Sequence, residues 1–69
     1  MEDVISLVQS ELAANNNDIL YSDFIEKVPY PQRPYVPEAM REMKRRGIAT
    51  RRNVFDRANG TNALHIVKL

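Results

Sequence analysis

The sequence predicts a small α+β domain in which three helices and a short strand precede a C-terminal β-hairpin. Two observations carry this prediction. Apolar residues recur every three to four positions through residues 2–14 and 36–43, the spacing of an amphipathic helix. After residue 47 the composition changes to branched and aromatic residues on both sides of Asn59-Gly60, as in two strands joined by a tight turn. Sixty-nine residues predict one domain, residues 1–69, with a small core.

The chain is organised around a predicted helix over residues 34–46. Its apolar stripe consists of Val36, Ala39, Met40 and Met43, at i, i+3, i+4 and i+7. Pro34 is tolerated in the first turn, where backbone N–H groups lack intrahelical partners. Gly47 follows three basic residues and predicts a left-handed C-cap. We expect this helix to lie on a core and to present a basic flank.

The preceding residues predict two shorter elements and a first helix. Residues 2–14 form that helix, with an apolar stripe of Val4, Ile5, Val8 and Leu12, and with Leu7 beside it. Asparagines 15–17 end it, because asparagine tolerates left-handed backbone. Residues 19–21 predict a short strand, and Ser22 is expected to cap a second helix from about Asp23 to Val28. Its candidates for burial are Phe24, Ile25 and Val28.

Four prolines lie in the nine residues that follow, 29–37. Their PxxP spacings also occur in polyproline ligands of aromatic grooves. A stiff turn is favoured, because the helical pattern resumes at Val36 and proline cannot continue the second helix.

The C-terminal residues predict strands over 48–55 and 63–69 with a turn over 56–62. A two-residue turn at Asn59-Gly60 would pair Phe55 with Leu64 and Val54 with His65. A longer loop would shift this register, so the sequence leaves the register open.

Several classes of function are disfavoured by composition. The chain has no cysteine, no glycine-rich phosphate loop and no carboxylate spacing that argues acid–base catalysis. Its single histidine, His65, has no recognisable partner in the sequence. We therefore expect no enzyme activity, no metal, no cofactor and no small-molecule substrate. No apolar run reaches the length of a membrane span or a signal-peptide core, so a cytoplasmic protein without a membrane partner is expected.

Charge is unevenly distributed, although the net charge is only +1. Residues 1–31 carry six acidic residues against Lys27, a net charge of −5, and residues 32–69 carry nine basic residues against three acidic ones, a net charge of +6. A dipolar molecule of this kind attracts phosphate to its basic half and is oriented by its acidic half. The alternative is that these charges only solvate the surface.

The order of elements resembles the winged helix-turn-helix family. The resemblance lies in Ile19-Leu-Tyr-Ser-Asp-Phe-Ile-Glu-Lys-Val28, in the stripe at residues 36–43 followed by Gly47-Ile48, and in the hairpin with Asn59-Gly60. It implies a small winged helix that binds double-stranded DNA, with helix 34–46 in the major groove and hairpin 50–68 as a wing on the backbone or the adjacent minor groove.

Carried over by position, the resemblance implies DNA contacts from both elements. The candidates on the helix and its approach are Gln32, Arg33, Tyr35, Glu38, Arg41 and Arg45, with Lys44 and Arg46 as phosphate contacts; those on the wing are Arg51, Arg52 and Arg57. Two features depart from the family pattern. The helix start is bulky and proline-bound, and Glu38 and Glu42 lie near the groove face, where ion pairs from Glu38 to Arg41 or from Glu42 to Arg45 or Arg46 are an alternative to DNA contact.

The resemblance and the small size imply a transcriptional regulator or a phage- or plasmid-type accessory factor, associated with the nucleoid in a prokaryote. A protein–protein interaction adaptor without direct DNA binding is the alternative. A homodimer or another protein partner would bury apolar surface, and Leu7 and Leu12 are the first candidates for it if they face outward on the first helix.

Overall fold

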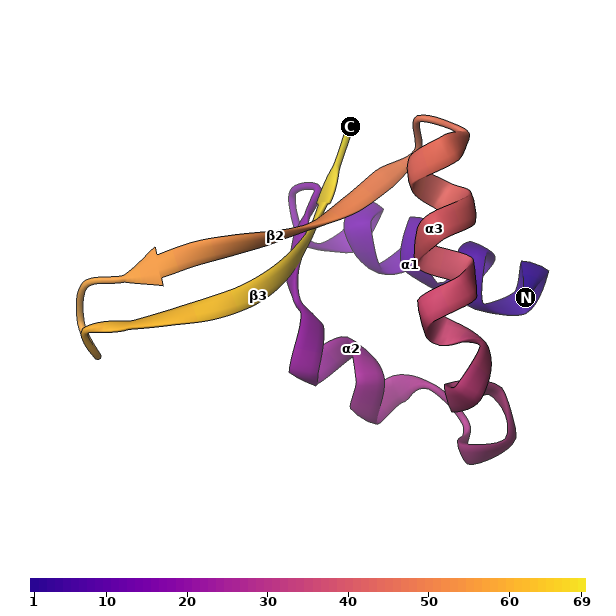
Figure 1. The fold of residues 1–69 in the computed structure, drawn as a ribbon, viewed down its shortest axis with the longest axis horizontal. Coiled ribbons are helices and arrows are strands. Elements are labelled where there is room, and N and C mark those ends of the chain that lie inside the picture. Colours follow the sequence, from indigo (N-terminus) through magenta and orange to yellow (C-terminus); the bar gives the residue numbers. More distant parts are fainter.

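The computed structural model describes residues 1–69 as an α+β arrangement of three helices and a three-stranded antiparallel sheet. Its elements in chain order are α1 (Glu2–Ala14), β1 (Asp18–Leu20), α2 (Tyr21–Lys27), a 3-10 helix η1 (Tyr30–Tyr35), α3 (Val36–Arg45), β2 (Ala49–Asp56) and β3 (Thr61–Lys68). The predicted fold class, a small winged helix with a C-terminal hairpin, is confirmed. The helices form a body from which the hairpin of β2 and β3 projects (Figure 1).

The sheet has the order β1-β3-β2, so β3 is central and β2 is an edge. Ile66 of β3 lies opposite both Ile19 of β1 and Arg51 of β2, and these three residues therefore share one face. We call it the inner face, because Ile19 and Ile66 are buried in the core. The opposite, outer face carries Leu20 and His65, which are paired with each other.

The core is a single cluster of apolar side chains drawn from the helices and from the inner face of the sheet. It contains Val4, Ile5, Val8, Leu12, Ile19, Phe24, Val28, Val36, Ala39, Met40, Met43, Ala49 and Ile66. The stripes predicted for the first and third helices are thus confirmed, and Leu7 and Ile25 pack half-buried against them. None of the helices is long and apolar enough to cross a lipid bilayer.

Left-handed residues end two of the helices, as the sequence predicts. Gly47 has φ +73°, its N–H donates to the carbonyl of Lys44, and the next N–H, of Ile48, donates to the carbonyl of Met43. These two hydrogen bonds form a Schellman motif, which turns the chain sharply from α3 into β2. At the end of α1, Asn16 and Asn17 take φ values of 57° and 65°.

Two helix boundaries were predicted wrongly. Ser22 caps no helix, because the extended backbone of Leu20 leads directly from β1 into α2, which begins at Tyr21. The third helix begins at Val36 and not at residue 34, and it ends at Arg45 with Arg46 as its cap. The prolines explain the later start. Residues 30–35 form the 3-10 helix, and α3 begins directly after it with Pro37 in its first turn. The segment is therefore the predicted stiff turn, and residues 30–35 do not form a polyproline II helix.

The hairpin turn is longer than two residues. Asp56 pairs with Thr61, which leaves Arg57–Gly60 as the loop. The Asp56 backbone carbonyl accepts the Gly60 N–H, and its carboxylate accepts hydrogen bonds from the Ala58 N–H and the Asn59 side chain. Phe55 consequently pairs with Asn62 and Val54 with Ala63, two positions from the tight-turn register. An even shift leaves every side chain on the same face.

Candidate nucleic-acid interface

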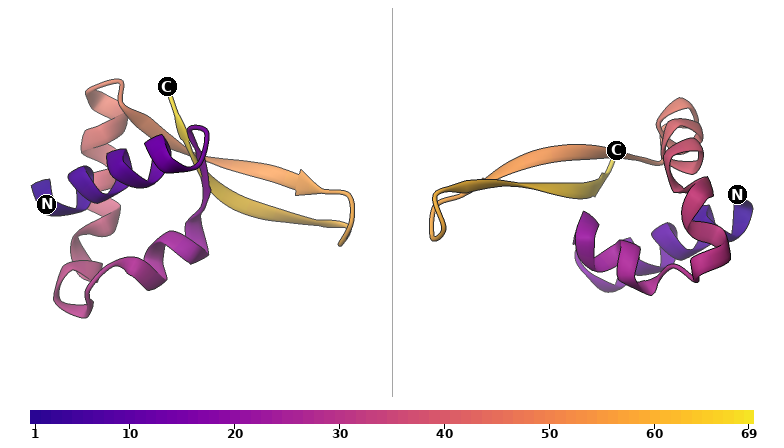
Figure 2. Two further views of the ribbon diagram at one scale, coloured as in Figure 1. Left: turned by 180° about the vertical axis from the view of Figure 1, so that it is seen from behind. Right: turned by 60° about the horizontal axis from the view of Figure 1, so that its bottom comes forward.

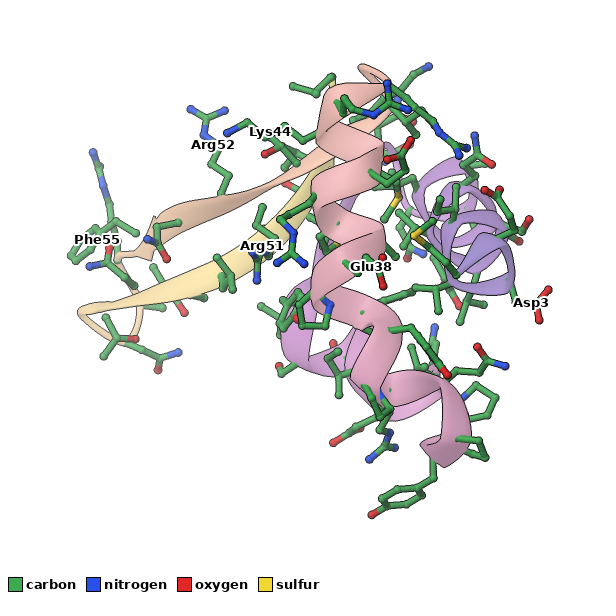
Figure 3. All side chains as sticks on the ribbon, turned by 45° about the vertical axis from the view of Figure 1, so that its right-hand side comes forward. Asp3, Glu38, Lys44, Arg51, Arg52 and Phe55 are labelled. Atoms are coloured by element: carbon green, nitrogen blue, oxygen red, sulfur yellow. The ribbon has the colours of Figure 1, made fainter.

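The exposed surface of α3 has two flanks with different surroundings. A helix advances 100° per residue, so Arg41 and Lys44 share one flank, while Glu42 and Arg46 share the other. Arg46 donates to Glu2 of α1, which shows that its flank faces α1. Figure 3 shows Lys44 on the opposite side of the helix, toward the hairpin. The basic residues predicted for α3 therefore do not form one continuous surface.

The hairpin-side flank borders a shallow recess between α3 and β2. The recess has a volume of about 230 Å³ and is lined by Met40, Arg41, Lys44, Thr50 and Arg51. We call it the basic recess, because three of its five lining side chains are cationic. Arg41, Lys44 and Arg51 form no ion pair with any carboxylate of the chain. Their charges are available to a ligand from outside.

The α1-side flank is neutralised within the chain. Arg45 and Arg46 both donate to the Glu42 carboxylate, and Arg46 also lies 2.9 Å from the Glu2 carboxylate. The hydrogen bond from Arg45, followed by that from Arg46, lowers the pKa of Glu42 from 4.5 to about 2. The alternative of helical ion pairs is thus confirmed for Glu42, whereas Glu38 and Arg41 form no such pair.

The two neighbouring arginines of β2 lie on opposite faces of the sheet. Arg51 pairs with Ile66 on the inner face, and its guanidinium lies 5.9 Å from the centre of the Tyr21 ring. Arg52 pairs with His65 on the outer face. In Figure 3 the two side chains point in opposite directions, with Arg51 beside α3. Only Arg51 joins the basic recess, and Arg57 lies farther out, in the exposed hairpin loop.

The residues predicted at the approach to α3 have separate environments. Arg33 donates from Nε to the carbonyl of Val28 at 3.0 Å, and its guanidinium lies 4.1 Å from the centre of the Tyr30 ring. Both contacts are internal to the turn between α2 and α3, which gives Arg33 a structural role. Gln32 lines a different groove, together with Asp3 of α1. The structure does not bring Gln32 and Arg33 together with the basic recess.

Two other candidates remain exposed on α3. Tyr35 is the N-cap residue of the helix, and Glu38 lies in its first turn. Figure 3 shows Glu38 on the side of α3 away from Arg51. Its carboxylate therefore does not line the basic recess.

Two residues of interest were missed at these surfaces. Thr50 lines the basic recess, and Phe55 is a large exposed side chain, 59% accessible. In the sequence, the one signal for Phe55 is strand alternation, which places it on the same face of the strand as Arg51.

His65 has a partner that the sequence did not reveal. Its Nδ1 lies 2.7 Å from Oδ1 of Asp18, which ties β1 to β3 across 47 positions of the chain. The prediction that His65 has no recognisable partner is corrected, and the contact is a structural one between neighbouring strands. No group of three or more His, Asp or Glu side chains is placed to hold a metal ion.

Comparison of the chain with family models, curated proteins and solved structures finds no match.

Proposed function

We propose that this chain is a member of the winged-helix family that binds double-stranded DNA without catalysis. In this proposal α3 enters the major groove with its hairpin-side flank, and the hairpin lies as a wing against the neighbouring backbone or minor groove. The observation that carries the proposal is the basic recess, where Arg41, Lys44 and Arg51 converge from two elements without a carboxylate partner.

Holding unpaired cations close together costs free energy. Like charges on adjacent elements repel one another, and a counter-ion of opposite sign relieves that repulsion. The phosphates of duplex DNA supply such charges at closely spaced, regular positions, and their neutralisation releases condensed counterions. The acidic residues that would compete lie elsewhere: Glu42 and Glu2 are paired on the α1-side flank, and the Asp56 carboxylate is bound within the hairpin loop.

In this role the protein acts where the DNA lies, in the cytoplasm and, in a prokaryote, at the nucleoid. Its small size favours a transcriptional regulator or a phage- or plasmid-type accessory factor. Base readout would come from Arg41, which can donate to a guanine edge, while Lys44, Arg51 and Arg57 would contact phosphates.

The proposal is tested by titrating random duplex DNA at several salt concentrations and measuring fluorescence anisotropy. We expect the logarithm of the association constant to fall with the logarithm of salt concentration at a slope of about −3 to −5, because each neutralised phosphate contributes about −0.9. An Arg41→Ala, Lys44→Ala double variant should show a slope shallower by about 1, because Lys44 is its phosphate contact, and a further loss of affinity from the guanine contact of Arg41.

The matched control is an Arg45→Ala, Arg46→Ala double variant. It removes two positive charges from the same helix, so it changes the net charge by the same amount. Because these arginines are paired with Glu42 and Glu2, we expect a smaller change of slope. Equal changes in the two double variants would show that only net charge matters. Absence of binding at low salt would overturn the proposal.

A protein–protein adaptor is the second candidate, and the outer face of the sheet favours it. No helix covers this face, and Leu20, Val54, Ala63 and Val67 are half-buried there. A homodimer could bury these side chains. Of the two residues that the sequence suggested for this contact, Leu12 is only 3% exposed and belongs to the core, whereas Leu7 is half-buried against the core. Sedimentation of wild type would give the mass of a dimer, and sedimentation of a Val67→Lys variant should give the mass of a monomer.

A further inference from the structure

Phe55 lies exposed near the far end of the projecting hairpin. Its side chain is 59% accessible and it does not belong to the core cluster. Figure 1 shows this end of the hairpin well clear of the helices, and Figure 3 places Phe55 there. Phe55 therefore does not pack against the core, and only a partner outside the chain would bury it.

The face on which Phe55 lies is the one that carries the basic recess. Residues two apart on a strand share a face, so Phe55 lies on the inner face with Arg51, and its cross-strand neighbour there is Asn62. Arg57 follows in the loop. Asp56 accepts hydrogen bonds from the Ala58 N–H and the Asn59 side chain and keeps its negative charge, but strand alternation places it on the outer face, away from the Phe55 ring. The ring therefore shares its own face with Arg51 and with no acidic residue of β2.

We propose that the hairpin tip enters the minor groove and that the Phe55 ring wedges between two base pairs, which kinks the duplex. The proposal deepens the proposed function and rests on it. Apolar side chains inserted at a base step partly unstack it and bend DNA by about 20–90°, and the bend brings more protein surface into contact with the duplex. Arginine is attracted to the minor groove by its strongly negative potential, which suits Arg57 in the loop that follows the ring.

The reach of the hairpin fits this geometry. Phe55 lies four residues beyond Arg51, which is about 13 Å along a strand that rises about 3.3 Å per residue. The centres of adjacent major and minor grooves lie roughly half a helical turn apart, about 17 Å along the axis. With α3 in the major groove and Arg51 at the intervening backbone, the ring of Phe55 can reach the next minor groove.

The outer half of the hairpin is free of the helical body in two further views of the ribbon. In both, the hairpin extends as a two-stranded arm with no helix against its outer half (Figure 2). An arm of this kind can enter a groove without a collision between the helical body and the DNA.

The test uses a 20-base-pair duplex with a fluorescent donor and acceptor at its two ends, which lie about 68 Å apart when the duplex is straight. Energy transfer is measured at saturating protein, and binding is measured in parallel by anisotropy. We expect wild type to raise the transfer efficiency. Phe55→Ala should bind within about fivefold of wild type but leave the duplex straight, and Phe55→Leu should keep part of the bend because leucine is also an apolar wedge.

Asn53→Ala is the matched control, because Asn53 lies on the same face of the same strand, two residues nearer the body. It should bend DNA as wild type does. A second readout is a duplex with a single T-A step in which 2-aminopurine replaces the adenine, since pyrimidine–purine steps unstack most easily. Wild type should raise the 2-aminopurine fluorescence and Phe55→Ala should not.

The outcomes separate the wedge from DNA binding itself. Wild type that binds but leaves the transfer efficiency unchanged would overturn the wedge and leave the proposed function standing. Equal bending by wild type and Phe55→Ala would also overturn it. Loss of all binding in Phe55→Ala, with circular dichroism unchanged, would overturn it as well, because Phe55 would then be needed for binding itself. If wild type binds no duplex in anisotropy, both proposals fail together.

Discussion

Arg51 and Arg52 are neighbours in the chain, yet their side chains leave β2 on opposite faces of the sheet. Arg51 lies opposite the buried Ile66 and joins the basic recess beside α3, whereas Arg52 lies opposite His65 on the face that no helix covers. A single flat surface cannot contact both. This pair therefore separates a defined DNA interface from a general attraction by positive charge.

The first prediction compares Arg51→Ala with Arg52→Ala. We expect Arg51→Ala to reduce the salt slope of duplex binding by about 1 and to weaken binding several-fold at moderate salt, because a phosphate contact is lost. Arg52→Ala should change both quantities much less, although the charge change is identical. Anisotropy titrations of the two variants measure this. A larger effect of Arg52→Ala on the salt slope and affinity would place the DNA interface on the outer face of the sheet.

The second prediction concerns Arg33, which the sequence placed among the DNA contacts. Its hydrogen bond to the Val28 carbonyl and its stacking on Tyr30 join α2 to the 3-10 helix. Arg33→Ala should lower the free energy of unfolding by about 1 kcal/mol, a typical value for a hydrogen bond with a modest cation–π contact. Urea denaturation measures this loss.

Arg33→Lys provides the control. Lysine keeps the positive charge, but it lacks the planar guanidinium that donates from Nε and stacks on the Tyr30 ring at the same time. It should recover little of the lost stability, and both variants should retain the salt slope of wild type at temperatures where they are folded. A reduced slope with unchanged stability would return Arg33 to the DNA interface.

The third prediction is a pH dependence that arises from Glu42. Arg45 and Arg46 hold the pKa of Glu42 at about 2 in the folded chain, below its ordinary value of 4.5. A lowered folded pKa means that the ion pairs stabilise the fold fully above about pH 5 and are lost as the pH falls through 4.5 toward 2. The melting temperature of wild type should decline over this interval.

Glu42→Gln isolates the contribution of this one carboxylate. The variant should melt at a lower temperature than wild type at pH 7, because it lacks the ion pairs of Glu42 with Arg45 and Arg46 at the end of α3. The difference between the two melting temperatures should shrink as the pH falls from 5 to 2, since protonation removes the same interaction from wild type. A difference that stays constant with pH would contradict the lowered pKa.

The fourth prediction concerns the end of α3, where Gly47 takes φ +73°. A side chain at this position meets no neighbouring atoms, so the penalty of a substitution comes from the backbone conformation alone. Gly47→Ala should lower the free energy of unfolding by about 1–2 kcal/mol, the cost of a left-handed residue other than glycine. This corresponds to a melting temperature lower by roughly 5–10 °C for a domain of this size.

Gly47→Asn is the companion variant. Asparagine adopts left-handed backbone more readily than alanine, as Asn16 and Asn17 do in this chain. Its melting temperature should lie between those of wild type and Gly47→Ala. A thermal scan that ranks Gly47→Asn below Gly47→Ala would show that something other than φ limits this position.

Much of the fold could be predicted from local patterns. The stripes at residues 4–12 and 36–43 identified the buried faces of α1 and α3, because helical periodicity is written directly in the spacing of apolar residues. Gly47 marked the end of α3, since few other residues accept its conformation. The order of elements and the hairpin followed from such signals, each of which involves residues close together in the chain.

Boundaries and register were less predictable. Ser22 had the right chemistry for an N-cap, but pairing of Asp18–Leu20 with β3 led the chain directly into α2 two residues earlier. The hairpin register depended on Asp56, whose carboxylate and carbonyl organise a four-residue loop in place of a two-residue turn. In both cases a local sequence signal competed with other interactions, and the sequence pattern does not show which of them is stronger.

The sequence by itself determined an α+β chain with an acidic first half, a basic second half and a helix whose one face is apolar. Only the tertiary structure decided which cations are free. Glu2, 44 positions away, reaches Arg46; Val28 and Tyr30 hold Arg33; and the strand pairing sends Arg51 and Arg52 to opposite faces. The physical reason is that a charge belongs to a residue, whereas its partner is chosen by distance in space, and distances between distant residues exist only after the chain has folded.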